Sequence, residues 1–254
     1  MCVNDRIELI PIRGVPIVEP GADLAALIAG ALGGQRLRLA DGDVLVVASK
    51  VVSKAEGRIV PLEGVRPSPL AAAFAADSGK DARVIELVMA EAKRIVKMAR
   101  GVLIVETRHG LVCANAGVDR SNVDGGDSVC LLPVDPDRSA RALRAALGQR
   151  LGVRPAVLIS DSFGRPWRLG QTQVAIGTAG LRPLDDLRGQ ADLAGFELSD
   201  TQDATADALA AAAGVCFRKA SGIAACLVRG FDHKADEASS ARELIRPSEQ
   251  DLFR

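Results

Sequence analysis

Residues 160–171 have the sequence SDSFGRPWRLGQ, and we predict that the rest of the fold is organised around this stretch. It follows an apolar run at residues 156–159, which predicts a short buried strand. Asp161 and Ser162 come at the end of that strand, beside a predicted glycine turn at Gly164. A carboxylate and a hydroxyl in this position can hold a divalent cation through oxygen ligands.

Two arginines complete this motif. Arg165 and Arg168 follow within a few residues, and the planar guanidinium group suits phosphate or carboxylate oxygens. The acid, the hydroxyl and the two arginines together favour a metal–phosphate site. The alternative is an ordinary surface loop in which Trp167 acts as a local apolar plug, and the composition of the stretch does not separate the two.

Length and composition limit the classes of protein to which this chain can belong. Its 254 residues, of which 48% are hydrophobic, provide one large domain or two closely packed ones. Lysine plus arginine equals aspartate plus glutamate, at 32 each. There is thus no broad basic field, and general nucleic-acid binding is not expected. Any recognition of phosphate must be local.

The sequence predicts no targeting signal and contains only two histidines. The N-terminal residues carry early charges and no apolar run of signal-peptide length, and no stretch approaches the ~20 apolar residues of a membrane span. The five cysteines show no CxxC spacing, which predicts reduced thiols and a cytoplasmic location. With only His109 and His233, a histidine-rich zinc site is excluded and a histidine-based triad is not expected.

The hydrophobic pattern predicts a mixture of strands and helices, and hence a mixed α/β fold. The segment at residues 173–181 contains glycines that permit close packing against a neighbouring backbone. Residues 133–137 contain two prolines and are the best candidate for an internal subdomain boundary. Strands are expected at residues 6–12, 44–48, 101–106, 110–113, 127–132 and 223–228, and helices at residues 23–32, 81–100, 138–148 and 203–213.

Polar residues follow the buried strand at residues 44–48. Ser49, Lys50 and Lys54 leave its end, where ligands commonly bind in α/β folds, and the Lys54 ammonium suits a phosphate as a point charge. No GxxxxGK[ST] motif occurs, so this is not a Walker site. The alternative is a solvated edge strand. Nearer the N-terminus, Gly14 permits a close backbone approach to a ligand, although an ordinary turn has the same composition.

A second polar stretch, at residues 115–123, follows another predicted strand. Asp119 is a second candidate metal ligand, and Asn122 can hydrogen-bond a nucleotide base or phosphate. Asp and Asn also fill ordinary turns, so this stretch alone is weak evidence. Together with Asp161 it carries more weight, because a hard cation usually takes more than one oxygen ligand.

Seven segments in order resemble the coenzyme F420-0:gamma-glutamyl ligase family. Each motif is modest alone, but the ordered set is specific and spans nearly the whole chain. The segments are PIRGVP at 11–16, VLVVASKVVSKAEGR at 44–58, NAGVDRSNV at 115–123, SDSFGRPWRLGQ at 160–171, VAIGTAG at 174–180, DDLRGQADLAGFEL at 185–198 and RPSEQDLFR at 246–254.

The resemblance implies a GTP-dependent ligase that uses Mg²⁺ or Mn²⁺ and K⁺. Such an enzyme joins L-glutamate to the lactyl carboxylate of coenzyme F420-0, through an acyl phosphate, and can add a further gamma-linked glutamate. The implied fold is a mixed α/β fold of the family's own, neither a P-loop nor an ATP-grasp fold, in an intertwined homodimer. We expect one ligase domain at residues 1–254, without the C-terminal flavin reductase domain of some members.

The resemblance also implies roles for individual residues. It assigns metal ligation to Asp119, Asp161 and Ser162. At residues 218–224 the chain departs from the family pattern. Arg218 stands where the family commonly has a glycine, Ser221 stands where it has an acidic residue, and Ala224 stands where it has a proline. An arginine there either reshapes the loop or points at phosphate. The GTP site is assigned to Arg13, Gly14, Val15, Pro16, Ser49, Lys50, Lys54, Asn122, Arg218, Lys219, Ala220, Ser221 and Gly222.

The chemistry needed for such a ligase agrees with the residues available. Phosphoryl transfer requires positioning and charge neutralisation more than a nucleophilic side chain, and Lys54, Arg165 and Arg168 are the candidate catalytic cations. Two other functions stay open. One is a paralogue that hydrolyses nucleotides or ligates another acid, and the other is a non-catalytic nucleotide sensor. The paired carboxylates of Asp119 and Asp161 favour an enzyme.

Overall fold

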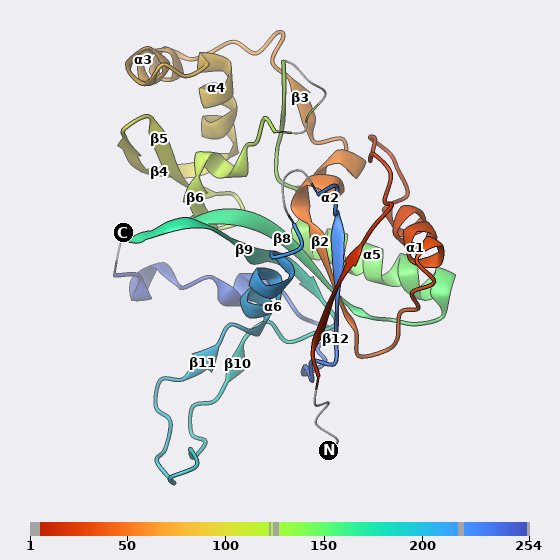
Figure 1. The fold of residues 1–254 in the computed structure, drawn as a ribbon. Helices are drawn as coiled ribbons and strands as arrows, with labels where there is room; N and C mark the ends of the chain where they lie inside the picture. Colours follow the sequence, from red (N-terminus) through yellow and green to blue (C-terminus); the bar gives the residue numbers. More distant parts are fainter. Residues whose placement is uncertain (1–5, 122, 124–126, 218–220, 253–254) are drawn as a thin grey trace.

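The computed structural model describes residues 6–121, 123, 127–217 and 221–252. Its centre is a five-stranded sheet (Figure 1) with the strand order β1-β12-β2-β8-β9. The mixed α/β character predicted from the sequence is confirmed. In the order of the sheet, the strands are β1 (Glu8–Ile12), β12 (Ala225–Arg229), β2 (Val44–Ala48), β8 (Ala156–Arg165) and β9 (Arg168–Ala179).

Strand β2 lies in the middle of this sheet. It pairs in parallel with β8 and antiparallel with β12, and the two outer pairs are also antiparallel. Val44, Leu45, Val46 and Val47 are all 0% exposed, because layers of helix cover both faces of the sheet. A strand buried on both faces has a continuous apolar sequence rather than an alternating one, which is why VLVVA predicted it correctly.

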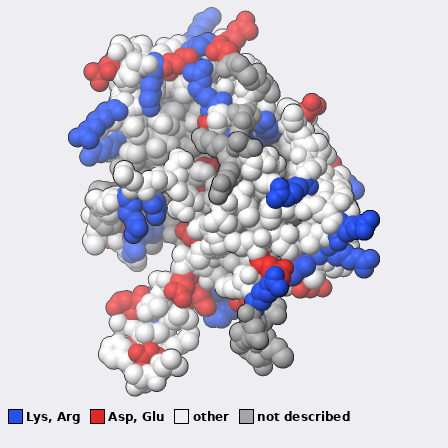
Figure 2. Space-filling model, viewed as in Figure 1, with Lys and Arg blue, Asp and Glu red and all other residues white. Residues whose placement is uncertain are grey.

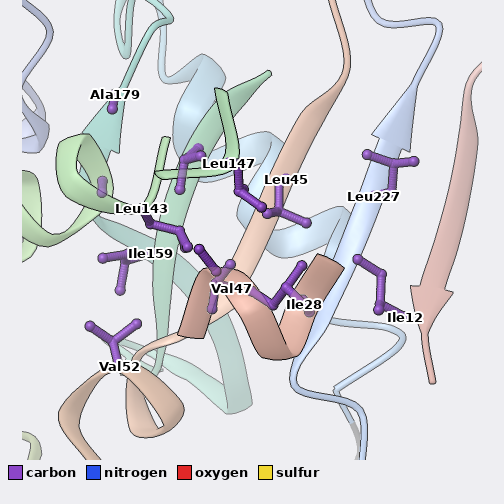
Figure 3. Packing of buried hydrophobic residues seen from close by; sticks show 14 of the residues in the cluster. Ile12, Ile28, Leu45, Val47, Val52, Leu143, Leu147, Ile159, Ala179 and Leu227 are labelled. Atoms are coloured by element: carbon purple, nitrogen blue, oxygen red, sulfur yellow. The ribbon is translucent and has the colours of Figure 1, made fainter. Parts of the chain in front are cut away.

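Three helices cover the two faces of the sheet. Figure 3 shows Ile28 of α1 and Leu143 and Leu147 of α5 in the same buried cluster as Leu45 and Val47 of β2. On the opposite face, α6 packs on the sheet through its alanines and Leu209. The bounds of these helices are α1 (Leu24–Gly34), α5 (Pro136–Leu151) and α6 (Thr205–Ala213).

A second lobe stands above the sheet in Figure 1 and has its own buried cluster. It contains two helices and a three-stranded sheet with the order β4-β5-β6. The two-stranded ribbon of β3 (Ile59–Pro61) and β7 (Ser128–Cys130) leads the chain into and out of it. Its elements are α3 (Pro69–Ser78), α4 (Ala82–Glu91), β4 (Ala92–Ala99), β5 (Val102–Thr107) and β6 (Val112–Ala114).

The predicted helix at residues 81–100 is wrong in its second half. Helix α4 ends at Glu91, and β4 then pairs antiparallel with β5. The turn between these strands falls on Arg100 and Gly101, whose φ angles are 49° and 71°. Ile95 of β4 packs against the buried cluster of the lobe. Strand pairing and burial thus override the helical spacing of apolar residues, since Ile95 and its neighbour Val96 also suit a pleated surface.

Strand β8 is longer than predicted. It continues past Ile159 to Arg165 and forms a long hairpin with β9. Gly164 therefore lies within the strand, and the predicted glycine turn is wrong. The turn is made by Pro166 and Trp167, the latter with a φ of 56°. Trp167 is 82% exposed, so the alternative in which it plugs the loop is also wrong.

The close packing predicted for residues 173–181 is confirmed at Gly177 of β9. A Cβ at this position would lie 2.4 Å from the carbonyl carbon and oxygen of Pro136, at the first turn of α5. No side chain fits in that space. The glycine therefore sets how closely α5 approaches the sheet.

The remaining elements are short. Residues between β10 (Asp185–Asp186) and β11 (Gln202–Asp203) form an arm that projects from the body in Figure 1. Within the described part of the chain, no helix combines the length and apolar character needed to cross a membrane. The described residues also include the short 3-10 helices η1 (Asn115–Gly117), η2 (Ala241–Leu244) and η3 (Ser248–Gln250).

Candidate active site

Four segments meet at one edge of the central sheet because of the directions of its strands. β2 and β8 are parallel, so the residues after both strands leave at the same edge. β12 runs antiparallel to both β1 and β2. The residues that precede β12 and those that follow β1 therefore arrive at this edge as well. Ligands commonly bind outside the carboxyl ends of strands in such folds.

This edge forms one wall of a cleft with a volume of about 910 Å³. The other wall comes from β6, η1 and the residues after it, and includes Cys113, Asn115 and Asp119. In Figure 2, lysine and arginine side chains gather over β4 and β5. The volume is within the range of about 300–1,000 Å³ typical of small-molecule sites.

Helix α2 (Ser49–Ala55) follows β2 without a loop. The alternative of a solvated edge strand at this position is therefore wrong. Lys50 and Lys54 are four residues apart, so they lie on the same face of the helix. Together with Ser49 they line the cleft. Among the described residues, the Lys54 ammonium has no ion-pair or hydrogen-bond partner.

Asp161 of β8 lies partly buried in the cleft and accepts a hydrogen bond of 2.7 Å from the Ser49 hydroxyl. Burial raises the pKa of Asp161 to about 6, and the negative charge of Asp119 adds to this rise. The Ser49 hydrogen bond and the positive charge of Lys50 oppose it. Burial thus destabilises the ionised form of the Asp161 carboxylate, and a bound cation would stabilise it.

Asp119 is the second carboxylate of the cleft. Lys50 Nζ lies 2.6 Å from its Oδ2 atom, and the backbone N–H of Ser121 donates to its Oδ1 atom at 2.7 Å. Burial alone would raise the pKa of Asp119, but the hydrogen bonds from Lys50 and Ser121 outweigh it and lower the pKa below its usual value. Asp119 is therefore ionised over the whole physiological range of pH.

The backbone around Asp119 fixes its position. Asn115, Ala116 and Gly117 have φ angles of 53°, 53° and 69°, so the chain turns sharply in η1. Asp119 then exchanges two backbone hydrogen bonds with Cys130, of 3.0 and 2.8 Å. These bonds connect the lobe to the strand that leads back to the central sheet. They also bring Asp119 across the cleft from Asp161, which lies 42 residues later in the chain.

Ser162 follows Asp161 and accepts a hydrogen bond of 2.6 Å from Gln173 Nε2. Gln173 is a cleft residue that the sequence analysis missed. It pairs with Ser162 in the β8–β9 register, and that pairing is the signal that would have found it. Ser121 and Ser160 were missed as well, and among the described residues the buried Ser160 hydroxyl has no hydrogen-bond partner.

The segment after β1 only partly lines the cleft. Val15 and Pro16 contribute to its wall, and their contact with nucleotide stays a prediction. Arg13 and Gly14 lie beside the cleft but do not line it, and the Arg13 backbone N–H donates to Gln35 Oε1 at 2.6 Å. Their contact with nucleotide stays a prediction.

The segment before β12 also reaches the cleft. Gly222, with a φ of 65°, lines it, while the Ser221 hydroxyl donates to the Cys216 carbonyl oxygen at 3.3 Å. Four further residues assigned to the GTP site lie outside the described residues, namely Asn122, Arg218, Lys219 and Ala220.

Arg165 and Arg168 lie at the end of the β8–β9 hairpin and do not line the cleft. Both are exposed, and Arg165 Nη2 donates to the Leu169 carbonyl oxygen at 2.7 Å. The fold of one chain therefore does not bring these two arginines to the carboxylates. Their catalytic role stays a prediction.

The donor set of the cleft suits a hard divalent cation. Asp119, Asp161 and Ser162 offer oxygen ligands only, which Mg²⁺ and Mn²⁺ prefer. Within the described residues, no cluster of three or more Asp, Glu, His or Cys side chains forms a complete metal cage. An ion here would complete its coordination with water and substrate phosphate, which is the usual arrangement for Mg²⁺.

Comparison with known proteins places the chain in a family. A family model described as F420-0:Gamma-glutamyl ligase matches residues 13–230. A protein from Methanothermobacter thermautotrophicus named Coenzyme F420:L-glutamate ligase is 44% identical over 98% of this chain and 99% of the relative. A protein of the same name from Methanopyrus kandleri is 45% identical over 98% of this chain and 97% of the relative. The chain therefore belongs to the F420-0:gamma-glutamyl ligase family.

Proposed function

We propose that this protein is a GTP-dependent ligase that adds L-glutamate to the lactyl carboxylate of coenzyme F420-0, and that it can add a further gamma-linked glutamate. The observation that carries the proposal is the meeting of two carboxylates, Asp119 and Asp161, with Lys50 and Lys54 in one cleft. The relatives named Coenzyme F420:L-glutamate ligase match nearly the whole chain. A nucleotide-driven ligase needs this combination of cation ligands and phosphate-binding lysines.

The reaction we propose has two steps. A carboxylate oxygen of the acceptor attacks the γ-phosphorus of GTP, and GDP leaves, which gives an acyl phosphate. The amine of glutamate then attacks the acyl carbon, and inorganic phosphate leaves as the amide bond forms. Neither step needs a nucleophile from the protein, because phosphoryl transfer depends mainly on positioning and charge neutralisation.

Each cleft residue has a part in this scheme. Asp119, Asp161 and Ser162 would hold Mg²⁺ or Mn²⁺, which when bound neutralises phosphate charge. Ser49 and Gln173 orient Asp161 and Ser162 through hydrogen bonds of 2.7 and 2.6 Å. Lys54 contacts the transferred phosphoryl group, where a preorganised positive charge stabilises the transition state. The K⁺ ion implied by the resemblance is part of the proposal.

We further propose that the protein acts as a homodimer. Trp167 and Leu169 at the end of the β8–β9 hairpin are 82% and 98% exposed. Leu193 and Phe196 on the projecting arm are 111% and 69% exposed. Large apolar side chains on projecting segments are typical of surfaces that a partner covers. Sedimentation of wild type and of a Trp167→Ser/Leu169→Ser variant tests this. We expect a dimer for wild type and a weaker dimer for the variant, and a monomeric wild type would refute the proposal.

The activity is tested by measuring products from GTP, L-glutamate and coenzyme F420-0 with Mn²⁺, with each substrate omitted in turn. We expect a glutamylated product by mass spectrometry and phosphate release that requires both glutamate and the acceptor. Asp161→Asn should lose activity by orders of magnitude. Asp77→Asn, at an exposed position of α3, is the matched control and should keep it.

The same assay separates the alternative functions. Phosphate release from GTP without acceptor would support a nucleotide hydrolase, and release that requires a different carboxylic acid would support a ligase of another specificity. Binding of GTP without any turnover would support a nucleotide sensor. Each of these results would contradict the proposed reaction, and the paired carboxylates explain why we favour an enzyme over a sensor.

A further inference from the structure

Two cysteines lie next to each other beside the cleft. Cys226 is the second residue of β12 and is 0% exposed, whereas Cys216, in the turn after α6, is only partly buried. Their Sγ atoms are 3.7 Å apart, and the Cys226 thiol donates a hydrogen bond to the Cys216 sulfur. Neither thiol has a part in the proposed ligase reaction.

We propose that Cys216 and Cys226 form a reversible disulfide when the protein meets a small-molecule disulfide, and that this bond changes the wall of the cleft. A disulfide requires an Sγ–Sγ distance of about 2.05 Å, so the two sulfur atoms must approach by about 1.7 Å from their present positions.

The two thiols differ in exposure, and this difference determines which of them reacts first. Burial raises the pKa of Cys226 to about 12, and the neighbouring Cys216 adds to this rise. Cys226 is fully buried and thus protected from reagents in solution, whereas Cys216 is only partly buried and reacts first, because reactivity depends on access.

The proposed thiol–disulfide exchange has two steps. The Cys216 thiolate attacks one sulfur of R–S–S–R and releases RS⁻, which gives a mixed disulfide on Cys216. The Cys226 thiol then loses its proton and attacks Cys216 Sγ, which releases the second RS⁻. The two protein thiols are oxidised to one disulfide, and the reagent is reduced to two RSH molecules, which take up the two protons.

The backbone determines which of the two residues moves. Cys226 pairs with Pro11 of β1 on one side and with Val46 of β2 on the other, so its position is fixed by strands on both sides. Cys216 lies in a turn and must make most of the approach. The next residue, Phe217, packs against the buried cluster under α6 and also lines the cleft. Movement of Cys216 therefore moves a wall of the cleft.

The covalent part of the proposal is tested on the full chain with oxidised glutathione as the reagent. Free thiols are alkylated after unfolding, and peptides are mapped without reduction. We expect a Cys216–Cys226 linked peptide that has lost two hydrogen atoms and is restored by dithiothreitol. Cys113 and Cys130, which are buried cysteines at other places, should stay reduced. Recovery of both Cys216 and Cys226 as alkylated thiols would overturn the proposal.

A variant separates the two steps. In Cys226→Ser the second thiol is missing, so Cys216 should keep glutathione as a stable mixed disulfide. Cys113→Ser is the control and should still give the Cys216–Cys226 peptide. A stable glutathione adduct on Cys216 in wild type, without the linked peptide, would also overturn the proposal, because it would show that Cys226 does not attack.

The effect on the cleft rests on the proposed function, and it is tested separately. Affinity for GTP in the presence of Mn²⁺ is compared between oxidised and reduced protein. We expect a several-fold difference in Kd for wild type and none for Cys216→Ser. Equal Kd values for both forms of wild type would overturn this part. Absence of GTP binding in both forms would instead refute the proposed function and, with it, any effect of the disulfide on nucleotide affinity.

Discussion

Replacing Asp161 by asparagine should stabilise the protein while it removes activity. Burial raises the pKa of this carboxyl from 3.8 to about 6, so its ionised form is less stable in the folded protein than in the unfolded chain. One pKa unit corresponds to about 1.36 kcal/mol, and the ionised carboxylate therefore costs about 3 kcal/mol at neutral pH. Asparagine has no charge and still offers an oxygen to the Ser49 hydroxyl.

The effect has a defined dependence on pH. The folded-state pKa lies above the unfolded-state value, so stability is lost as the pH rises from about 4 to about 6 and stays constant above that range. The gain from Asp161→Asn should accordingly be close to zero near pH 4 and reach its full value at pH 7.5. For a chain of this length, about 3 kcal/mol corresponds to an increase in Tm of about 6–12 °C.

The measurement is urea denaturation of chelator-treated protein at both pH values, with Asp77→Asn as the control. The control should differ from wild type by less than about 0.5 kcal/mol, as is usual for exposed positions. An Asp161→Asn variant no more stable than wild type at pH 7.5 would refute the reasoning. A gain of equal size at pH 4 and pH 7.5 would refute it too, because an effect of packing alone does not follow ionisation.

Three further outcomes are expected. Gly177→Ala should destabilise the protein by about 1–3 kcal/mol in urea denaturation, because its Cβ would lie 2.4 Å from the Pro136 backbone; unchanged stability would contradict this packing. Lys54→Met should lower kcat by about 10²–10³-fold without loss of stability, while the exposed Lys80→Met keeps wild-type rates; equal rates for both would remove Lys54 from the mechanism. Chelation of divalent cations should abolish phosphate release and added Mn²⁺ should restore it, whereas activity that survives chelation would contradict the proposed ion site.

Much of the fold follows from local patterns in the sequence. The continuous apolar run of β2 predicted its burial, and the helix expected at residues 23–32 is α1 (Leu24–Gly34), which Asp23 caps. The glycine at 177 was correctly connected with a close backbone approach. In each of these cases the signal lies in the residues of one segment.

The errors share a physical cause, since they concern pairing and contacts with other segments, which the pattern of one segment does not contain. Residues 92–99 have a helical spacing of apolar positions, but pairing with β5 makes them a strand. Gly164 was placed in a turn because the antiparallel partner of β8 could not be seen from β8 alone. The bond between Lys50 and Asp119 joins residues 69 positions apart. No local pattern contains this bond, and none contains the hydrogen bond from Gln173 to Ser162.

The central claim is that Asp119 and Asp161 bind the metal complex of GTP in the cleft. Calorimetric titration of wild type, Asp161→Asn and Asp77→Asn with GTP and Mn²⁺ tests it most directly. We expect binding to wild type and Asp77→Asn and loss of binding to Asp161→Asn, and the expected higher stability of that variant would show that the loss is not caused by unfolding. Equal affinity of all three proteins would show that Asp161 does not bind the metal complex of GTP.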